Sequence, residues 1–263
     1  MAQYIRTDLS GGVLTVTLDR PDKLNAFIAP MSAELQEALK RAAEEDDIRC
    51  MLLTGSGRAF CAGQDLPEVV EREKEEPNYE LAQTVRESYN PVIRGIRHLE
   101  KPVVCAVNGT AAGAGANMAF ACDIVFASSE ASFVQSFSKI GLIPDSGGTF
   151  LLPRLVGLQR ANMLYMLDEK ISAGRAVEMG LAYRAVEPDK LMEEAKATSA
   201  KLASLPTRGF GLYKRAVNRS FGQTLDEHLE LEAELQSEAG ETHDYKEGVQ
   251  AFLEKRKPEY TGR

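Results

Sequence analysis

The sequence has no tryptophan and only three histidines and four cysteines in 263 residues, and these scarcities exclude several classes of protein. The cysteines at positions 50, 61, 105 and 122 lie in or beside apolar runs, not in the short paired spacings of disulfide scaffolds and zinc sites. We therefore expect free thiols in a reducing cytoplasm and no metal site. His98, His228 and His243 fall in helical or charged surface patterns, which disfavours a histidine-based nucleophile.

Long apolar runs and excess positive charge are also missing. No apolar stretch approaches the roughly 20 residues of a membrane helix, and the N-terminus lacks the basic start and apolar stretch of a signal peptide. We expect a soluble cytoplasmic protein that binds no membrane. The formal net charge of -8 disfavours a nucleic-acid surface, although a local basic patch could still hold a single anionic ligand.

What the sequence does contain is an alternation of short apolar strands and amphipathic helices. Alternating apolar and threonine residues predict a half-buried strand at residues 13–18, and a helical pattern opens at Pro30. Apolar runs predict buried strands at residues 50–54, 103–107 and 122–127. Buried strands separated by helices favour an α/β fold with a mostly parallel sheet.

The last third of the sequence has a different character. Apart from a strand near residues 181–186, helical patterns dominate, at residues 191–205, 224–239 and 245–255. No linker rich in glycine, serine or proline separates the parts, so we expect a core over residues 1–200 covered by a helical layer over residues 201–263. Residues 67–80 are charged and flanked by prolines, which predicts a mobile surface segment.

Asp145 is the first candidate for catalysis, because the stretch 141–149 places its carboxylate where a strand-like run turns into a glycine-softened helix start. A carboxylate at such a position is suited to acid/base work. Asp145 or Ser146 capping the following helix is an equally good interpretation. The sequence Asp-Ser-Gly-Gly also occurs around the nucleophile of trypsin-like proteases, but those enzymes are all-β and none of the histidines fits as their base.

Two further segments are suited to hold a negatively charged oxygen near Asp145. Small residues at 109–118 follow a strand and begin a helix, which leaves backbone N–H groups free, and residues 59–66 repeat this logic with an amide at Gln64. Close helix packing and an ordinary turn are the alternatives, and Asp65 is more typical of a turn or a helix cap. Met118 breaks the glycine fingerprint of dinucleotide sites, so we expect no nicotinamide cofactor.

Five segments, in order along the whole chain, resemble the crotonase or enoyl-CoA hydratase/isomerase family. They are Arg-Pro with Leu-Asn-Ala at 20–26, Phe-Cys-Ala-Gly-Gln-Asp at 60–65, Lys-Pro-Val-Val with Val-Asn-Gly at 101–109, Ala-Cys-Asp-Ile at 121–124, and Gly-Leu-Ile-Pro with Gly-Gly-Thr at 141–149. The resemblance implies a spiral of ββα turns, a C-terminal helical layer that forms trimers or hexamers, and acyl-CoA thioester substrates. It implies an oxyanion hole made by the backbone N–H groups of Gln64 and Ala114, and no cofactor beyond the substrate's own CoA.

The departures from the family pattern narrow the expected reaction. The two glutamates that manage water in hydratases correspond to Asn117 and Phe137 here, and neither side chain transfers a proton. Several isomerases of the family place a single acid/base at or near the position of Asp145. Residues 137–149 and the ending at 252–258 resemble the family's ring-epoxide isomerases of phenylacetate catabolism. An acyl-CoA isomerase acting through a thioester enolate is therefore expected, with a hydratase or an idle acyl-CoA-binding homologue as alternatives.

The resemblance also assigns the residues that bind the rest of the substrate. They are Lys23, Ala26, Ala62, Asn117, Phe137 and Lys255. The CoA phosphates need positive charge, for which Arg20, Lys23 and the run from Lys255 to Lys257 are the candidates, although that run also suits a solvated helix end.

Overall fold

The computed structural model, which describes residues 3–76 and 78–263, contains two sheets that are built up together as the chain advances. The six-stranded sheet has the order β1-β2-β3-β5-β7-β10. In it β1 (Ile5–Ser10) and β2 (Val13–Leu18) are antiparallel, and β3 (Cys50–Gly55), β5 (Val103–Val107), β7 (Ile124–Ser128) and β10 (Arg184–Val186) continue in parallel. The predicted strands are confirmed, except that β7 begins two residues late because Cys122 ends the preceding helix.

The second sheet is smaller and determines where the site lies. Its order is β4 (Ala59–Cys61), β6 (Thr110–Ala112), β8 (Ser132–Val134) and β9 (Ile171–Ser172). Three times the chain adds one strand to the large sheet and the next strand to the small sheet, as β3 and β4, β5 and β6, and β7 and β8, and then returns through helices. This repetition is the spiral of ββα turns that the resemblance implies.

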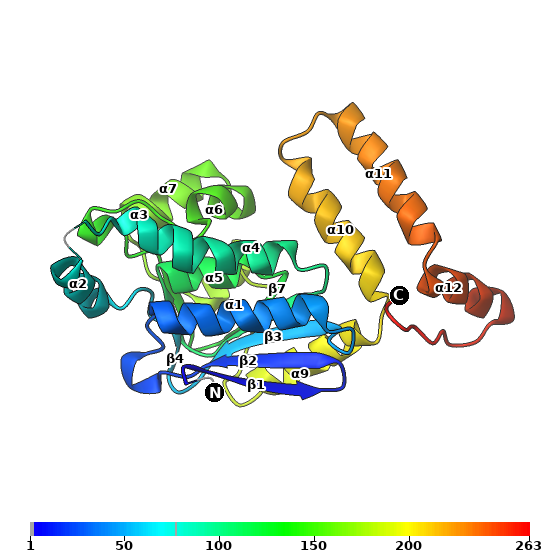
Figure 1. The fold of residues 1–263 in the computed structure, drawn as a ribbon, viewed down its shortest axis with the longest axis horizontal. Helices are drawn as coiled ribbons and strands as arrows, with labels where there is room; N and C mark the ends of the chain where they lie inside the picture. The colour runs from blue at the N-terminus through cyan, green and yellow to red at the C-terminus, as the bar shows by residue number, and fades with distance from the viewer. Residues whose placement is uncertain (1–2, 77) are drawn as a thin grey trace.

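Helices cover both faces of the large sheet (Figure 1). Leu14, Met51 and Leu53 point to the face covered by α1, α4 and α5, whereas Leu52 and Phe126 point to the face covered by α9. No helix in the described part of the chain is long and apolar enough to cross a lipid bilayer. The helices are η1 (Pro21–Lys23), α1 (Ala29–Glu44), α2 (Leu66–Glu75), α3 (Leu81–Thr84), the π-helical turn η2 (Val85–Tyr89), α4 (Asn90–His98), α5 (Ala114–Ala121), η3 (Ser138–Ile140), α6 (Gly148–Val156), α7 (Leu158–Met166), α8 (Ala173–Glu178), α9 (Leu191–Ala203), α10 (Thr207–Ser220), α11 (Leu225–Gly240) and α12 (His243–Glu254).

The segment at residues 67–80, predicted to be mobile and on the surface, is helical in its first part. Residues Leu66–Glu75 form the helix α2, although none of its side chains is buried. Pro67 lies in the first helical turn, where the missing N–H has no acceptor to lose. Pro77, the second flanking proline, lies outside the described residues. The strand β1, the strands of the small sheet and the helices α3, α4, α7, α8 and α10 were not predicted.

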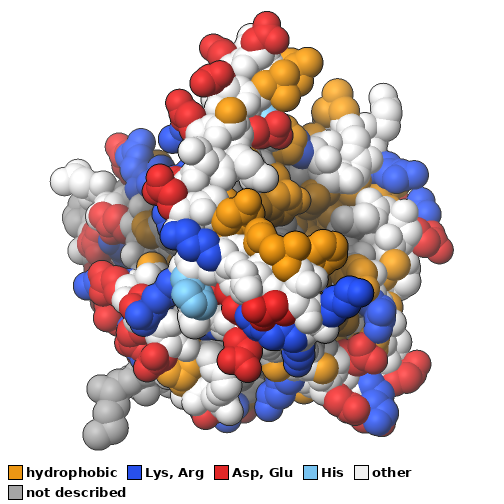
Figure 2. All heavy atoms as spheres, turned by 90° about the vertical axis from the view of Figure 1, so that its right-hand side faces the viewer, with side chains coloured by type: hydrophobic (Ala, Val, Ile, Leu, Met, Phe, Trp, Pro, Cys, Tyr) orange, Lys and Arg blue, Asp and Glu red, His pale blue; other side chains and the backbone are white. Residues whose placement is uncertain are grey.

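The C-terminal helices α10, α11 and α12 stand apart from the sheets, at the right of Figure 1. The predicted boundary at residue 200 falls inside α9, which packs on the large sheet, so the break between elements lies at residues 204–206. Figure 2 faces this side of the molecule and shows apolar side chains gathered in its hollows. The exposed large apolar residues of these helices include Tyr213, Leu229, Tyr245, Phe252 and Leu253.

Candidate active site

Three parallel strands of the small sheet end at the same edge. Cys61 in β4 pairs with Ala111 in β6, and Ala112 pairs with Val134 in β8. The residues that follow these strands therefore meet, as the carboxyl ends of parallel strands do at ligand sites in α/β proteins. They are Ala62–Gln64, Gly113–Ala114 and Gln135–Phe137. The fold thus brings the two segments predicted to form the oxyanion hole together with a third segment, Gln135–Phe137.

These loops enclose a cavity of about 260 Å³. Among the described residues that line it, Asp145 carries the only carboxylate. Predicted residues Ala62, Gln64, Ala114, Phe137 and Asp145 all line the cavity. The remaining lining residues are Gly63, Leu66, Leu81, Tyr89, Gly113, Gln135, Ser136, Lys139, Ile140 and Leu142.

The two amides predicted as the oxyanion hole have no hydrogen-bond acceptor within residues 3–76 and 78–263. The N–H of Gly113, immediately before Ala114, donates to the Val134 carbonyl oxygen over 2.9 Å, and the N–H of Asp65, immediately after Gln64, donates to Phe27 O over 3.1 Å. The amides of Gln64 and Ala114 are thus free to donate at the cavity, and Ala114 is the first residue of α5, where a backbone N–H has no partner inside the helix.

Glycines bring the two amides to the same place. Gly63 has a φ of 90°, and a Cβ there would lie 2.9 Å from the Ala112 carbonyl oxygen. A Cβ on Gly115 would lie 2.4 Å from the Cys61 carbonyl oxygen. Both contacts join the segment after β4 to the segment after β6. Close packing, the alternative explanation for these small residues, is therefore also correct, and it is what places the amides side by side.

Asp145 is not a helix cap. The capping position of α6 is Gly147, and no side chain caps that helix end. Instead, Ser146 Oγ donates a hydrogen bond to Asp145 Oδ1 over 2.9 Å. Burial raises the pKa of the Asp145 carboxyl, and the hydrogen bond from Ser146 opposes the rise. A carboxylate with a raised pKa is a stronger base for taking a proton from carbon.

The amide side chains of Asn117 and Gln135 form a hydrogen-bonded chain that holds the backbone of Asp145. Asn117 Nδ2 donates to the Asp145 carbonyl oxygen over 2.9 Å, and Gln135 Nε2 donates to Asn117 Oδ1 over 3.1 Å. Asn117 is fully buried and is not among the residues that line the cavity, so its predicted contact with substrate is not what the structure shows. The carbonyl group fixes the orientation of Asn117 and thereby that of Gln135, whose Oε1 is enclosed without a partner among the described residues.

Of the basic residues predicted to contact the CoA phosphates, Arg20 is paired within the protein and Lys23 is exposed. Arg20 is engaged, because it pairs with Asp65 at 3.0 Å and also donates to the Ala26 carbonyl oxygen. Asp65 therefore serves this ion pair and does not cap α2 with its side chain. Lys23 is exposed on η1. Ala26 does not line the cavity; it holds Arg20 through its carbonyl group.

The basic residues after α12 lie far from the cavity. Arg256 pairs with Glu247 and with Glu254, which raises its pKa. Lys255 follows α12, which lies on the opposite side of the molecule in Figure 1 from α2 and α3, whose first residues line the cavity. Lys255 therefore does not reach the cavity of its own chain.

Several cavity residues were missed by sequence reasoning. Leu66, Leu81 and Tyr89 come from the segment α2 to η2, which carries no motif. Gln135 had a usable signal, because it follows a strand and precedes Phe137 by two residues. Lys139 lies at the rim with an exposed side chain that pairs with Asp168 at 2.6 Å.

Comparison with known proteins settles the family. A family model described as enoyl-CoA hydratase/isomerase matches residues 8–263. The chain belongs to the enoyl-CoA hydratase/isomerase family. This confirms the resemblance in the sequence and the fold class that it implied.

Relatives of this hydratase/isomerase family member carry more than one activity in their names. It is 48% identical to 1,2-epoxyphenylacetyl-CoA isomerase of Escherichia coli K12, over 100% of both chains. It is 46% identical to a probable enoyl-CoA hydratase of Rhodobacter capsulatus, over 98% of each. The crystal structure of a putative enoyl-CoA hydratase/isomerase from Mycobacterium abscessus superposes with a TM-score of 0.93 at 36% identity, over 98% of this chain and 100% of that one.

Proposed function

We propose that this hydratase/isomerase family member is an acyl-CoA isomerase with Asp145 as its acid/base. One observation carries the proposal: among the described residues lining the cavity, Asp145 is the single carboxylate, beside two free backbone amides. Adding water across a double bond is the work of two carboxylates in the family's hydratases, whereas moving a proton between two carbons needs one.

In the proposed reaction the thioester oxygen lies between the N–H groups of Gln64 and Ala114. The Asp145 carboxylate takes a proton from the carbon next to the thioester carbonyl, and the electron pair of the broken C–H bond forms an enolate whose oxygen accepts both hydrogen bonds. Protonated Asp145 then returns the proton to another carbon of the acyl group as the double bonds shift. The carboxylate is regenerated, and no proton is gained or lost.

We further propose a ring epoxide of phenylacetyl-CoA as the substrate, with a 3-enoyl-CoA as the simpler alternative. The support is the relative from Escherichia coli, whose name is that of such an isomerase and which aligns over the full length. A cavity walled by Leu66, Leu81, Phe137, Ile140 and Leu142 suits an apolar ring.

The experiment is a turnover panel on the purified full chain: a ring epoxide of phenylacetyl-CoA, a 3-enoyl-CoA and crotonyl-CoA. Isomerisation of the first two with little hydration of the third supports the proposal. Hydration of crotonyl-CoA as fast as any isomerisation would establish a hydratase, the function that the name of the Rhodobacter relative favours. Binding without turnover of all three would establish an idle acyl-CoA-binding protein.

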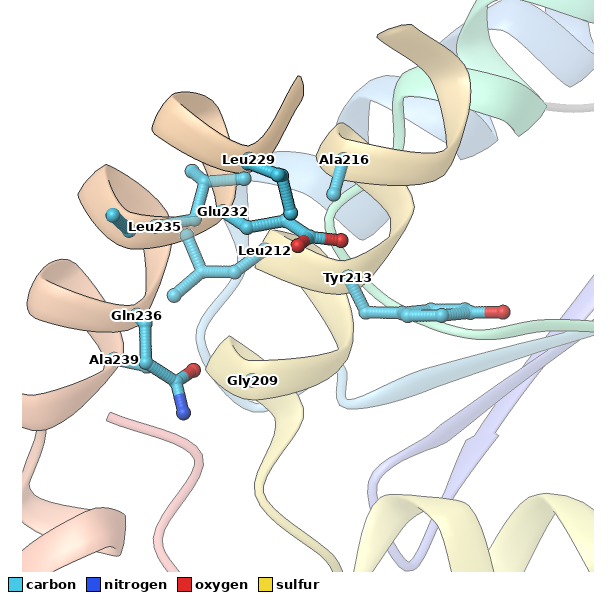
Figure 3. A pocket seen from close by; sticks show the side chains of 10 residues that line it. Gly209, Leu212, Tyr213, Ala216, Leu229, Glu232, Leu235, Gln236 and Ala239 are labelled. Atoms are coloured by element: carbon cyan, nitrogen blue, oxygen red, sulfur yellow. The ribbon is translucent and has the colours of Figure 1, made fainter. Parts of the chain in front are cut away.

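Assembly into trimers or hexamers belongs to the same proposal. A hollow of about 640 Å³ lies between α10 and α11, lined by Leu212, Tyr213 and Leu229 among others (Figure 3). Although it is larger than the Asp145 cavity, its only carboxylate among the described residues is that of Glu232, whose side chain is 55% exposed. We propose that the apolar faces of α10, α11 and α12 bind further copies of the chain, and that Lys255 reaches a CoA ester only across such a contact, whereas Lys23 serves its own chain.

A further inference from the structure

Tyr89 lines the cavity and has no part in the proton transfer described above. It ends the π-helical turn η2, between α3 and α4. A π-helical turn contains one residue more than an α-helical turn, which changes the direction of the side chains after it, and such turns are frequent at functional sites. This turn delivers an aromatic ring to the same cavity as the three strand ends.

The ring of Tyr89 is held firmly in place. Its side chain stacks on Phe27 with ring centroids 5.7 Å apart and an angle of 25° between the planes. Phe27 forms two backbone hydrogen bonds with the segment that carries the Gln64 amide. Its N–H donates to Gly63 O over 2.7 Å, and its carbonyl oxygen accepts from Asp65 N over 3.1 Å. Tyr89 therefore has a fixed position relative to the amide of Gln64.

The hydroxyl group of Tyr89 opens onto the cavity. It forms no hydrogen bond within the described part of the chain, although the residue is only 3% exposed. It is also not among the fully enclosed side-chain oxygens that lack a hydrogen-bond partner in the described residues, of which Gln135 Oε1, in the same cavity, is one. The hydroxyl is consequently the accessible tip of a buried ring, in a cavity whose other polar groups include Asp145.

Tyr89 is a donor and not a base. Burial raises its pKa well above the ordinary value, and the charge of Asp145 adds to the rise. The phenol therefore stays protonated and can donate its proton to a hydrogen bond. Tyr89 and Asp145 line the same cavity.

In the proposed reaction the amides of Gln64 and Ala114 bind the thioester oxygen and Asp145 transfers the proton, so the Tyr89 hydroxyl is a buried donor of this cavity to which no substrate atom has been assigned. The hydrocarbon chain of a simple 3-enoyl-CoA offers it no acceptor, whereas an epoxide or ether oxygen does. We propose that the Tyr89 hydroxyl donates a hydrogen bond to an oxygen atom within the acyl group, and that Tyr89 is the residue that selects oxygen-bearing acyl groups over plain enoyl groups. The inference rests on the proposed isomerase function, and it involves no bond breaking at Tyr89.

The test is Tyr89→Phe, which removes the hydroxyl and keeps the ring stacked on Phe27. We expect kcat/KM on the ring epoxide of phenylacetyl-CoA to fall about 3- to 10-fold, the usual worth of one neutral hydrogen bond, with less than about twofold change on the 3-enoyl-CoA. Tyr183→Phe is the matched control, because Tyr183 is 60% exposed and does not line the cavity. It is expected to leave both rates unchanged.

A second measurement keeps binding separate from turnover. Wild type should bind 2-hydroxyphenylacetyl-CoA more tightly than phenylacetyl-CoA, and Tyr89→Phe should remove that preference. Equal losses on both substrates, or no loss on the epoxide, would overturn the role of Tyr89 while leaving the isomerase intact. A wild type that isomerises only the 3-enoyl-CoA would instead overturn the proposed ring-epoxide substrate, and this inference with it.

Discussion

The spiral core and the C-terminal helices bury their apolar side chains to very different extents. In the core, the large sheet is covered on both faces, and Leu52, Leu53 and Val104 are fully enclosed. In the helices α10, α11 and α12, the buried cluster consists of Leu212, Leu231 and Leu235. Phe252 and Leu253 are 82% and 69% exposed.

The contacts described below between the core and the C-terminal helices are polar, whereas the core itself packs through apolar side chains. Lys214 of α10 is buried and donates to Asp123 Oδ2 over 2.6 Å and to the carbonyl oxygens of Ile96 and Lys101. Arg208 and Arg215 pair with Glu100 in the core and with Glu238 in α11. Polar contacts thus fix the orientation of the layer, and its apolar faces remain uncovered. This difference fits the proposals that the core carries the chemistry and that the layer binds further copies of the chain.

The largest expected effect tests the core alone. Asp145→Asn keeps the size of the side chain and cannot accept a proton, so isomerisation should fall by about 100- to 10,000-fold. CoA-ester binding should stay within a few-fold, and the oligomeric state should not change. A variant that keeps a tenth of the wild-type turnover would show that another group is the base.

The next largest effect distinguishes the backbone N–H groups of the oxyanion hole from the side chain of Gln64. Ala114→Pro removes the N–H at the first residue of α5, where proline suits the helix, and should cost roughly 100-fold in kcat. Gln64→Ala keeps the backbone N–H and should cost little. Circular dichroism and thermal melting would verify folding in both. A large loss from Gln64→Ala at unchanged folding would assign the substrate contact to the amide side chain.

Breaking the polar contacts between the core and the C-terminal helices should lower the free energy of unfolding. Asp123→Ala leaves the buried ammonium group of Lys214 without its carboxylate, which we expect to lower the free energy of unfolding by about 3 kcal/mol. Lys214→Met should cost less, because Asp123 keeps the Val103 N–H and Arg97 as partners. Urea unfolding of the two variants checks the order. Equal and small losses of unfolding free energy would mean that these polar contacts contribute little to stability.

The layer is tested by a charge on its exposed face. Phe252→Asp should shift the protein toward monomers in sedimentation velocity, because it places a carboxylate in the proposed contact. KM for the CoA ester should rise if Lys255 serves a neighbouring copy, while the melting of the core stays similar. Leu9→Asp, on the edge strand β1, is the matched control. Unchanged sedimentation of the Phe252 variant would exclude α12 from the contact.

How much of the fold the sequence predicts depends on burial. The runs at 50–54 and 103–107 are buried on both faces, and short apolar runs of this length are typical of strands in a covered sheet. The edge strand β1 escaped prediction because Arg6 and Asp8 break its pattern, and β1 is exposed beyond its first residue. Helix α2 escaped because it buries no side chain, so its charges resemble those of a loop.

The site divides in the same way between local and long-range information. Asp145 and the amide of Gln64 follow from local rules about strand ends and free amides, whereas Ala114 was assigned by the resemblance to the family, and the fold brings all three to one cavity. Tyr89 does not follow from such rules, because its position depends on a π-helical turn and on stacking against a residue 62 positions earlier. The engagement of Arg20 by Asp65 is likewise a contact between distant segments.

The smallest expected effect concerns the pH dependence of the core reaction. Asp145 must be ionised to accept a proton, so kcat/KM should fall as the pH drops through its pKa, which burial raises above the ordinary 3.8. Ser146→Ala removes the hydrogen bond that opposes this rise, and should therefore move the acidic limb of the profile to higher pH. Ser220→Ala, in α10, should leave the limb in place.

The stability of the protein should show the same raised pKa with its own sign. A carboxyl whose pKa is raised on folding binds its proton more tightly in the native state, so its contribution to stability is present below pH 3.8 and is lost as the pH rises through the folded pKa. At neutral pH the ionised Asp145 therefore destabilises the core. Asp145→Asn should unfold at a higher denaturant concentration than wild type at pH 7, and the difference should shrink toward pH 4. A variant less stable than wild type at pH 7 would show that the charge of Asp145 is well solvated, and that its basicity has another origin than burial.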